Sequence, residues 1–212
     1  YATLDLKKEN FVSLTLKILD EQETLSLAEK SKRKDQSQKR PRVYEKIQSY
    51  FDGMLDGQIS PILRLKINRS LCNLHCAHCC EEPYMSRDLK KRTGAIDPRR
   101  QMSLDDYRKL SEEADAFGIF RFVLTGGEAL LDKNLDQLID ALDPQKHLII
   151  LDTNGWTFDE DKARWFAELG GYKAQISLDS MVEAEHDAFR GRKGSYKRVI
   201  RALHAAKSAG LE

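Results

Sequence analysis

The chain has 212 residues, of which 41% are hydrophobic, and 35 lysines and arginines against 34 acidic residues leave a net charge of +1. This length and composition suit one globular domain with an appendage and exclude a disordered chain. The balanced charge gives no global field that would favour nucleic acid or a membrane surface as a partner.

The four cysteines all lie between positions 72 and 80. Crowded cysteines are typical of a metal site, whereas a disulfide framework spreads its cysteines along the chain. We therefore expect a protein of the reducing cytoplasm. The sequence also contains no apolar run of about 18 residues, so we expect no membrane-spanning helix.

Residues 1–60 are expected to form a small α/β appendage. Alternating apolar positions in segment 10–19 favour a half-buried strand. Seven lysines and arginines between Lys30 and Arg42 favour a solvated linker over a tract that binds phosphate or an acidic peptide. Apolar residues at helical spacing predict a helix from Tyr44 to Leu55.

Residues 61–212 are expected to form the main domain, because strand and helix patterns alternate along them. Such alternation predicts parallel β/α units, whose functional groups gather where the strands end. Four units and an abrupt end suggest an incomplete barrel. The predicted strands are 61–68, 119–124, 147–151 and 172–178, and the predicted helices are 103–117, 131–142, 159–169 and one from residue 195 onward.

A cysteine loop follows the first predicted strand, with Cys72, Cys76 and Cys79 at C-x3-C-x2-C spacing. A 4Fe-4S cluster normally takes four cysteines, so three ligands leave one iron open to a small molecule. A zinc site remains an alternative, since Cys80 can join these three cysteines as a fourth ligand, with His75 or His78 in reserve. Cys80 itself is open to three roles, namely a small buried hydrophobe, a substitute ligand or a working thiol.

Glycine and acidic residues follow the second predicted strand as Gly126-Gly127-Glu128. The cysteine spacing, the aromatic His78 before the last cysteine and this Gly-Gly-Glu turn together resemble the motifs of the radical S-adenosylmethionine (radical SAM) enzymes. The resemblance implies a cluster on Cys72, Cys76 and Cys79. It also implies a binding site for S-adenosylmethionine formed by His78, Gly126, Gly127, Glu128, Asn154, Ser177, Asp179 and Arg190.

The resemblance assigns these residues separate roles. It places His78 near the adenine, the two glycines beside the methionine group and Glu128 at its ammonium. Asn154, Ser177 and Asp179 would hold the carboxylate and ribose, and Arg190 would also meet the carboxylate. From the residues alone, Asn154, Ser177 and Asp179 can each be a helix cap, and an ion pair at the surface is an equally supported reading of Arg190.

The resemblance further implies an α/β fold of the partial (β/α) barrel type, here truncated, and an enzyme that cleaves S-adenosylmethionine reductively to make a 5'-deoxyadenosyl radical. A flavodoxin or ferredoxin would supply the electron. The segment 186–203 is similar to enzymes that mature ribosomal peptides or build peptide-derived and molybdenum cofactors. A peptide is therefore the first expected substrate, small-molecule or nucleotide cofactor synthesis the second, and a zinc-stabilised interaction module the alternative outside enzymes.

Overall fold

The computed structural model describes residues 38–54, 62–67, 71–79 and 102–212. The chain divides into two compact units, Tyr1–Pro41 and Arg42–Glu212, and the whole sheet belongs to the second. The strand expected in segment 10–19, most of the basic tract and Cys80 lie outside the described residues. The domain boundary expected after residue 60 stays a prediction.

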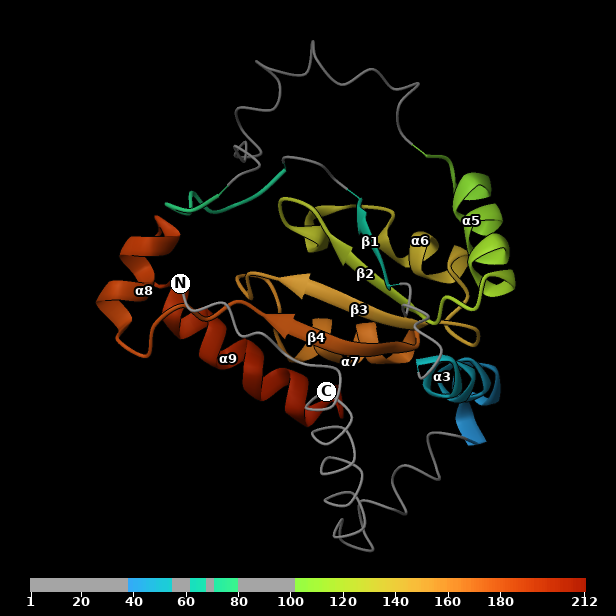
Figure 1. Ribbon diagram of the computed structural model, residues 1–212. Coiled ribbons are helices and arrows are strands. Elements are labelled where there is room, and N and C mark those ends of the chain that lie inside the picture. The colour runs from blue at the N-terminus through green and yellow to red at the C-terminus, as the bar shows by residue number, and fades with distance from the viewer. Residues whose placement is uncertain (1–37, 55–61, 68–70, 80–101) are drawn as a thin grey trace, which may run out of the picture. The chain divides into compact units, whose positions relative to one another are not determined.

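The second unit is built on one parallel sheet of four strands in the order β1-β2-β3-β4 (Figure 1). Helices alternate with the strands, which confirms the predicted α/β class. The strands are β1 (Ile62–Lys66), β2 (Arg121–Thr125), β3 (Leu148–Thr153) and β4 (Gly171–Ile176). The helices are α3 (Pro41–Met54), α5 (Leu104–Ala116), α6 (Leu135–Ala141), α7 (Glu160–Glu168), α8 (Glu183–Arg190) and α9 (Ser195–Ser208), with a short 3₁₀ helix η3 (Ala129–Leu131) after β2.

Local capping explains where two of the predicted helices begin. Ser103 and Asp106 form a capping box at α5, in which each side chain accepts a hydrogen bond from the other residue's backbone N–H. At α7 the Asp159 carboxylate accepts a hydrogen bond from the Lys162 N–H at 3.0 Å. These caps satisfy amide groups that a helix cannot satisfy internally, so both helices start within a residue of their predicted positions.

Helix α8 was not predicted, because the segment after β4 was treated as one stretch leading into α9. The signals for it are present in the sequence. Glu183 and Glu185 lie in its first turn, where their negative charges interact favourably with the positive end of the helix dipole. Gly191 ends the helix in the left-handed conformation, with φ of 65°.

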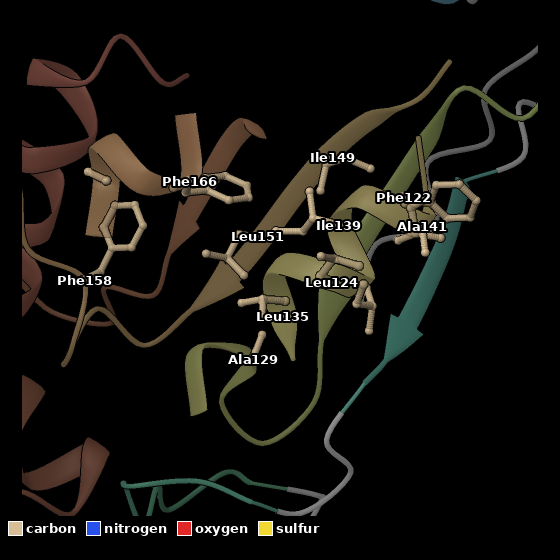
Figure 2. Close-up of a cluster of buried hydrophobic side chains, with 14 of the residues drawn as sticks. Phe122, Leu124, Ala129, Leu135, Ile139, Ala141, Ile149, Leu151, Phe158 and Phe166 are labelled. Carbon is tan, nitrogen blue, oxygen red and sulfur yellow. The ribbon is translucent and has the colours of Figure 1, made fainter. Parts of the chain in front are cut away.

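The hydrophobic core lies between one face of the sheet and the helices (Figure 2). Phe122 and Leu124 of β2 and Ile149 and Leu151 of β3 point to this face, as their alternation requires. Burying such a side chain completely stabilises the fold by roughly 1.5–3 kcal/mol. The core therefore fixes the strands, and with them the positions of the loops at their carboxyl ends. Helices contribute Leu135, Ile139, Ala163 and Phe166, and Phe158 comes from the loop before α7.

The opposite face of the sheet carries charged side chains. Arg64 of β1 and Asp152 of β3 form an ion pair at 3.2 Å across β2. Burial raises the pKa of the Asp152 carboxyl, and Arg64 acts against that shift. At the β4 edge, the Glu212 N–H donates to the Tyr172 carbonyl at 3.3 Å and the Ala174 N–H donates to the Glu212 carbonyl at 3.1 Å, which is the ladder of a parallel neighbour.

A buried polar cluster joins α3 to the end of the sheet where β2 and β3 begin. The Lys46 ammonium donates to the Ile119 carbonyl at 2.9 Å and pairs with Asp115 at 2.8 Å. The ring nitrogens of the fully buried His147 lie 3.0 Å from the Ile119 carbonyl and 3.2 Å from the Ser111 carbonyl. Burial, together with the nearby Lys46 charge, lowers the pKa of His147 to about 4. The folded protein therefore holds this imidazole neutral at pH 7.

We predict that His147 makes the fold less stable in mild acid. Below its ordinary pKa of 6.5 the unfolded chain binds a proton that the folded chain does not take up until about pH 4. The free energy of unfolding should therefore fall by up to about 3 kcal/mol as the pH drops through this window. Urea unfolding at a series of pH values measures it, with His147→Gln as the reference. Parallel pH profiles for the two proteins would contradict the assignment.

Candidate functional site

The cysteine loop, residues 71–79, lies at the carboxyl end of β1 and beside α8 (Figure 1). Its three cysteines are free thiols; Cys72 is buried, whereas Cys76 and Cys79 are partly exposed. The Cys79 N–H donates to the Cys76 carbonyl at 3.1 Å, which closes a tight turn between them. Cys72 is therefore held inside the protein, whereas Cys76 and Cys79 remain partly accessible to solvent.

The glycine turn after β2 packs directly on the cysteine loop. A Cβ atom added at Gly127 would lie 2.2 Å from the Leu71 carbonyl oxygen, closer than real Cβ contacts come. The next residue, Glu128, donates its N–H to that same oxygen at 2.7 Å. The resemblance predicts that the room at Gly127 serves the methionine group of a ligand. In the structure the backbone of Leu71, one residue before Cys72, occupies it.

The Glu128 carboxylate is buried and ties the turn to the end of β3. It accepts hydrogen bonds from the Thr153 hydroxyl at 2.7 Å and from the Asn154 N–H at 2.8 Å, one on each oxygen, and from the Leu130 N–H at 3.3 Å. Burial raises the pKa of this carboxyl, and the same three hydrogen bonds act in the opposite direction. Glu128 thus has a clear structural role, and its contact with a ligand ammonium stays a prediction.

Asn154 connects the end of β3 to the first cysteine. Its Nδ2 donates to the Asn73 side-chain oxygen at 2.8 Å and lies 3.7 Å from the Cys72 sulfur. Its Oδ1 accepts the Trp156 N–H at 2.9 Å, which fixes the orientation of the amide. An amide donor beside a sulfur favours the thiolate form that a metal ligand needs.

Helix α8 holds the cysteine loop from the other side. The Ala77 N–H donates to the Phe189 carbonyl at 2.8 Å, and the His75 N–H donates to the Arg190 carbonyl at 3.2 Å. A Cβ atom added at Gly191 would lie 2.2 Å from the His75 carbonyl oxygen. Backbone contacts without side chains between them therefore fix the residues on both sides of Cys76.

Arg190 is part of a buried ion pair, so the surface reading of this residue is wrong. It is 8% exposed, and its Nε pairs with the Asp179 carboxylate. Its Nη1 lies 3.5 Å from the Cys76 sulfur. The Asp179 N–H donates to Nδ1 of the buried His186 at 3.3 Å, so this histidine helps to hold the segment after β4.

The remaining predicted residues lie around this centre. His78 stacks on Phe189 with ring centroids 4.5 Å apart and an angle of 8° between the planes, and it is exposed. Ser177 continues the β3–β4 ladder, because its N–H donates to the Thr153 carbonyl at 3.0 Å. Gly126 has a φ of 148° at the start of the turn. Among the described residues, the side-chain hydrogen bonds to the cysteine sulfurs come from Asn154 and Arg190 and not from these three.

Sequence reasoning missed several residues that hold the loop. Arg192 donates to the Asn73 carbonyl at 2.7 Å, and its guanidinium lies 3.5 Å from the centroid of the Trp156 ring. The sequence carried no specific signal for this role beyond residue type, since the planar guanidinium of any Arg can donate several hydrogen bonds and stack on an aromatic ring. The residues missed in this way are Leu71, Asn73, Thr153, Phe189 and Arg192.

The donor set fits an iron–sulfur cluster. Within the described part of the chain, no three Cys, His, Asp or Glu side chains gather around a single metal ion. A 4Fe-4S cluster bonds its cysteines through different iron atoms, so its ligands need not converge on one point. The cysteine loop offers three free thiols that could each bond a different iron atom. N–H groups of Asn154 and Arg190 lie at two of the sulfurs.

Parallel β/α units with a cysteine loop after the first strand and a Gly-Gly-Glu turn after the second define the class as a cluster-binding α/β protein. Residues 70–212 match the radical SAM superfamily. The chain belongs to this family.

Its curated relatives have several functions. It is 28% identical over 141 residues to the Fe-coproporphyrin III synthase of Methanosarcina barkeri, covering 66% of this chain and 33% of that protein. It is 33% identical over 143 residues to the probable GTP 3',8-cyclase of Halobacterium salinarum, covering 66% and 37%. It is 26% identical over 162 residues to the sporulation killing factor maturation protein SkfB of Bacillus subtilis, covering 76% and 36%. The chain thus spans well under half the length of these relatives.

Solved structures show the same fold. Native anSMEcpe with bound AdoMet aligns with a TM-score of 0.54 at 22% identity, covering 72% of this chain and 42% of that one. The complex of the same protein with AdoMet and the Kp18Cys peptide aligns with a TM-score of 0.53. This likeness confirms the partial-barrel architecture. No helix in the described ranges is both long and apolar enough to cross a bilayer.

We predict that Gly127→Ala displaces the cysteine loop and lowers the iron content several-fold, because its Cβ would meet the Leu71 carbonyl at 2.2 Å. Overpacking of this kind also costs about 1–3 kcal/mol of stability. Gly118→Ala is the matched control, since Gly118 has a φ of 74° with nothing within 4 Å. It should cost roughly 1–2 kcal/mol through strain and keep its iron. Full iron occupancy in Gly127→Ala would contradict the proposed packing role.

We also predict that Thr153→Val destabilises the fold by about 1–3 kcal/mol. The Thr153 hydroxyl donates to the buried Glu128 carboxyl group at 2.7 Å and accepts the Gly155 N–H at 3.1 Å. Valine would leave these buried partners unsatisfied. Thr153→Ser keeps the hydroxyl and should lose much less. Chemical denaturation of the two variants tests this difference. A loss in Thr153→Ser as large as or larger than that in Thr153→Val would contradict the role of the hydroxyl, because Ser keeps the hydroxyl and Val keeps a methyl group in its place.

Proposed function

We propose that this protein is a radical SAM enzyme whose cluster is held by Cys72, Cys76 and Cys79. The observation that supports this most strongly is the anchoring of three free thiols on one loop by two strand ends and one helix. Three ligands leave one iron of the cluster open. When bound, the cluster supplies one electron that breaks a carbon–sulfur bond of S-adenosylmethionine, giving methionine and a 5'-deoxyadenosyl radical that takes a hydrogen atom from the substrate.

The chain's own residues would bind and orient the S-adenosylmethionine. The stacked ring of His78 offers a flat surface at the rim of the site, which suits an adenine. Gly126 lies at the start of the turn beside the cysteine loop, and Ser177 and Asp179 follow β4 at the same sheet edge. Asn154 and Glu128 hold the loop and line its inner side. We assign the cofactor site to this edge of the domain formed by residues 61–212, with residues 1–60 as an appendage.

A peptide is the proposed substrate class. The similarity to a sporulation killing factor maturation protein supports it. The second candidate is synthesis of a nucleotide or tetrapyrrole cofactor, supported by the similarity to GTP 3',8-cyclases and an Fe-coproporphyrin III synthase. A reducing donor such as a flavodoxin or ferredoxin would deliver the electron, and free cysteines suit a reducing cytoplasm.

Analysis of the protein purified without oxygen tests the function. We expect iron with acid-labile sulfide, visible iron–sulfur absorption, and 5'-deoxyadenosine after addition of dithionite and S-adenosylmethionine. Cys72→Ala, Cys76→Ala and Cys79→Ala should each lose both signals, and Cys80→Ala should keep both. Stoichiometric zinc without sulfide would favour an interaction module instead, and loss of the signals in Cys80→Ala would make that cysteine a fourth ligand.

A further inference from the structure

The Arg190 side chain contacts a cysteine of its own chain. Its Nη1 lies 3.5 Å from the Cys76 sulfur, and its Nε pairs with Asp179. The residue is 8% exposed. A buried guanidinium is costly unless its N–H groups are satisfied, so the two contacts fix its position. The group that sequence resemblance assigns to a ligand carboxylate therefore lies against a proposed cluster ligand.

We propose that Arg190 is a positioning residue for Cys76 that raises the reduction potential of the cluster. This inference rests on the proposed function, because it requires a cluster on Cys72, Cys76 and Cys79. Arg190 lies beside the reacting centre, and its guanidinium acts through the sulfur of Cys76.

Charge explains the direction of the effect. Reduction adds one electron to the cluster, and part of that charge is carried by the cysteine sulfurs. A cation or an N–H donor beside a sulfur stabilises the reduced form more than the oxidised form, and so raises the potential. Because Arg190 is buried, water screens its charge less than it would at the surface, although Cys76 itself is partly exposed. The Asp179 carboxylate, on the Nε side of the guanidinium, offsets part of the positive charge.

Neighbouring residues show why this role falls to Arg190. Asn154 also contacts a cysteine sulfur, at 3.7 Å, but its amide is neutral. Arg192 contacts the same loop, but it donates to the Asn73 carbonyl and stacks on Trp156. Arg190 combines a full charge with direct contact to a sulfur.

The backbone makes the electrostatic effect separable from a structural one. Residues on both sides of Cys76 are held by main-chain hydrogen bonds to the Phe189 and Arg190 carbonyls, at 2.8 and 3.2 Å. These bonds do not depend on the Arg190 side chain. Replacing that side chain should therefore leave the loop anchored while it removes the charge at the sulfur.

Redox titration of the full protein, followed by EPR in the absence of S-adenosylmethionine, tests the proposal. Arg190→Gln should lower the equilibrium constant for one-electron reduction at least tenfold, a downward shift of about 59 mV. Arg190→Lys keeps the charge and should recover most of that loss. Asp179→Asn removes the offsetting carboxylate and should shift the potential upward. Arg192→Gln, the matched control, should shift it much less than Arg190→Gln.

Each outcome decides the question once iron and sulfide contents are matched. A fully loaded Arg190→Gln protein with the wild-type potential overturns the inference, as does a downward shift in Asp179→Asn. If Arg190→Gln holds no cluster, Arg190→Lys at the wild-type potential with an upward shift in Asp179→Asn supports it. A wild-type protein without a cluster overturns the proposed function itself. A wild-type protein that forms 5'-deoxyadenosine but shows no shift in these variants overturns the inference alone.

Discussion

The site depends on the close approach of backbone to backbone around the cysteine loop. Gly127 on one side and Gly191 on the other lack the Cβ atoms that would each lie 2.2 Å from a carbonyl oxygen of the loop. Because no side chain separates these segments, main-chain hydrogen bonds form directly from the Glu128 N–H to the Leu71 carbonyl and from the His75 N–H to the Arg190 carbonyl. A loop that carries three thiols is held in this way without a core of its own.

Two buried ionisable side chains, Glu128 and Arg190, extend these contacts around the cysteine loop. The Glu128 carboxylate joins the turn after β2 to the end of β3, and the Arg190 guanidinium joins α8 to the loop. Each is satisfied by hydrogen bonds, since an unsatisfied charge at such depth would cost several kcal/mol. The Glu128 side chain lies near Cys72, whereas the Arg190 guanidinium lies at the Cys76 sulfur. The positive charge of Arg190 therefore acts on Cys76 in particular.

Much of the fold was predictable because its signals are local. Alternating apolar runs, the Ser103 cap and the glycines that end helices located the four strands and most of the helices. The cysteine spacing and the Gly-Gly-Glu turn likewise indicated the family. The contacts were not predictable, because they join residues far apart in the chain. The contact between Gly127 and Leu71 and the contact between Arg190 and Cys76 are not indicated by any local sequence pattern.

The role of Gly127 shows how a motif can be recognised correctly and explained incompletely. Resemblance links the Gly-Gly-Glu turn to the cofactor, whereas the geometry shows it packed on the loop that carries the cluster ligands. The two roles are physically connected, because a small molecule can bind an open iron only if the other three ligands stay in place. A residue that packs against Leu71 also constrains Cys72 after it, so Gly127 can affect ligand binding through the cysteine loop as well. The same reasoning applies to Gly191 and Arg190, so the environment of the sulfurs is set by residues from three separate elements.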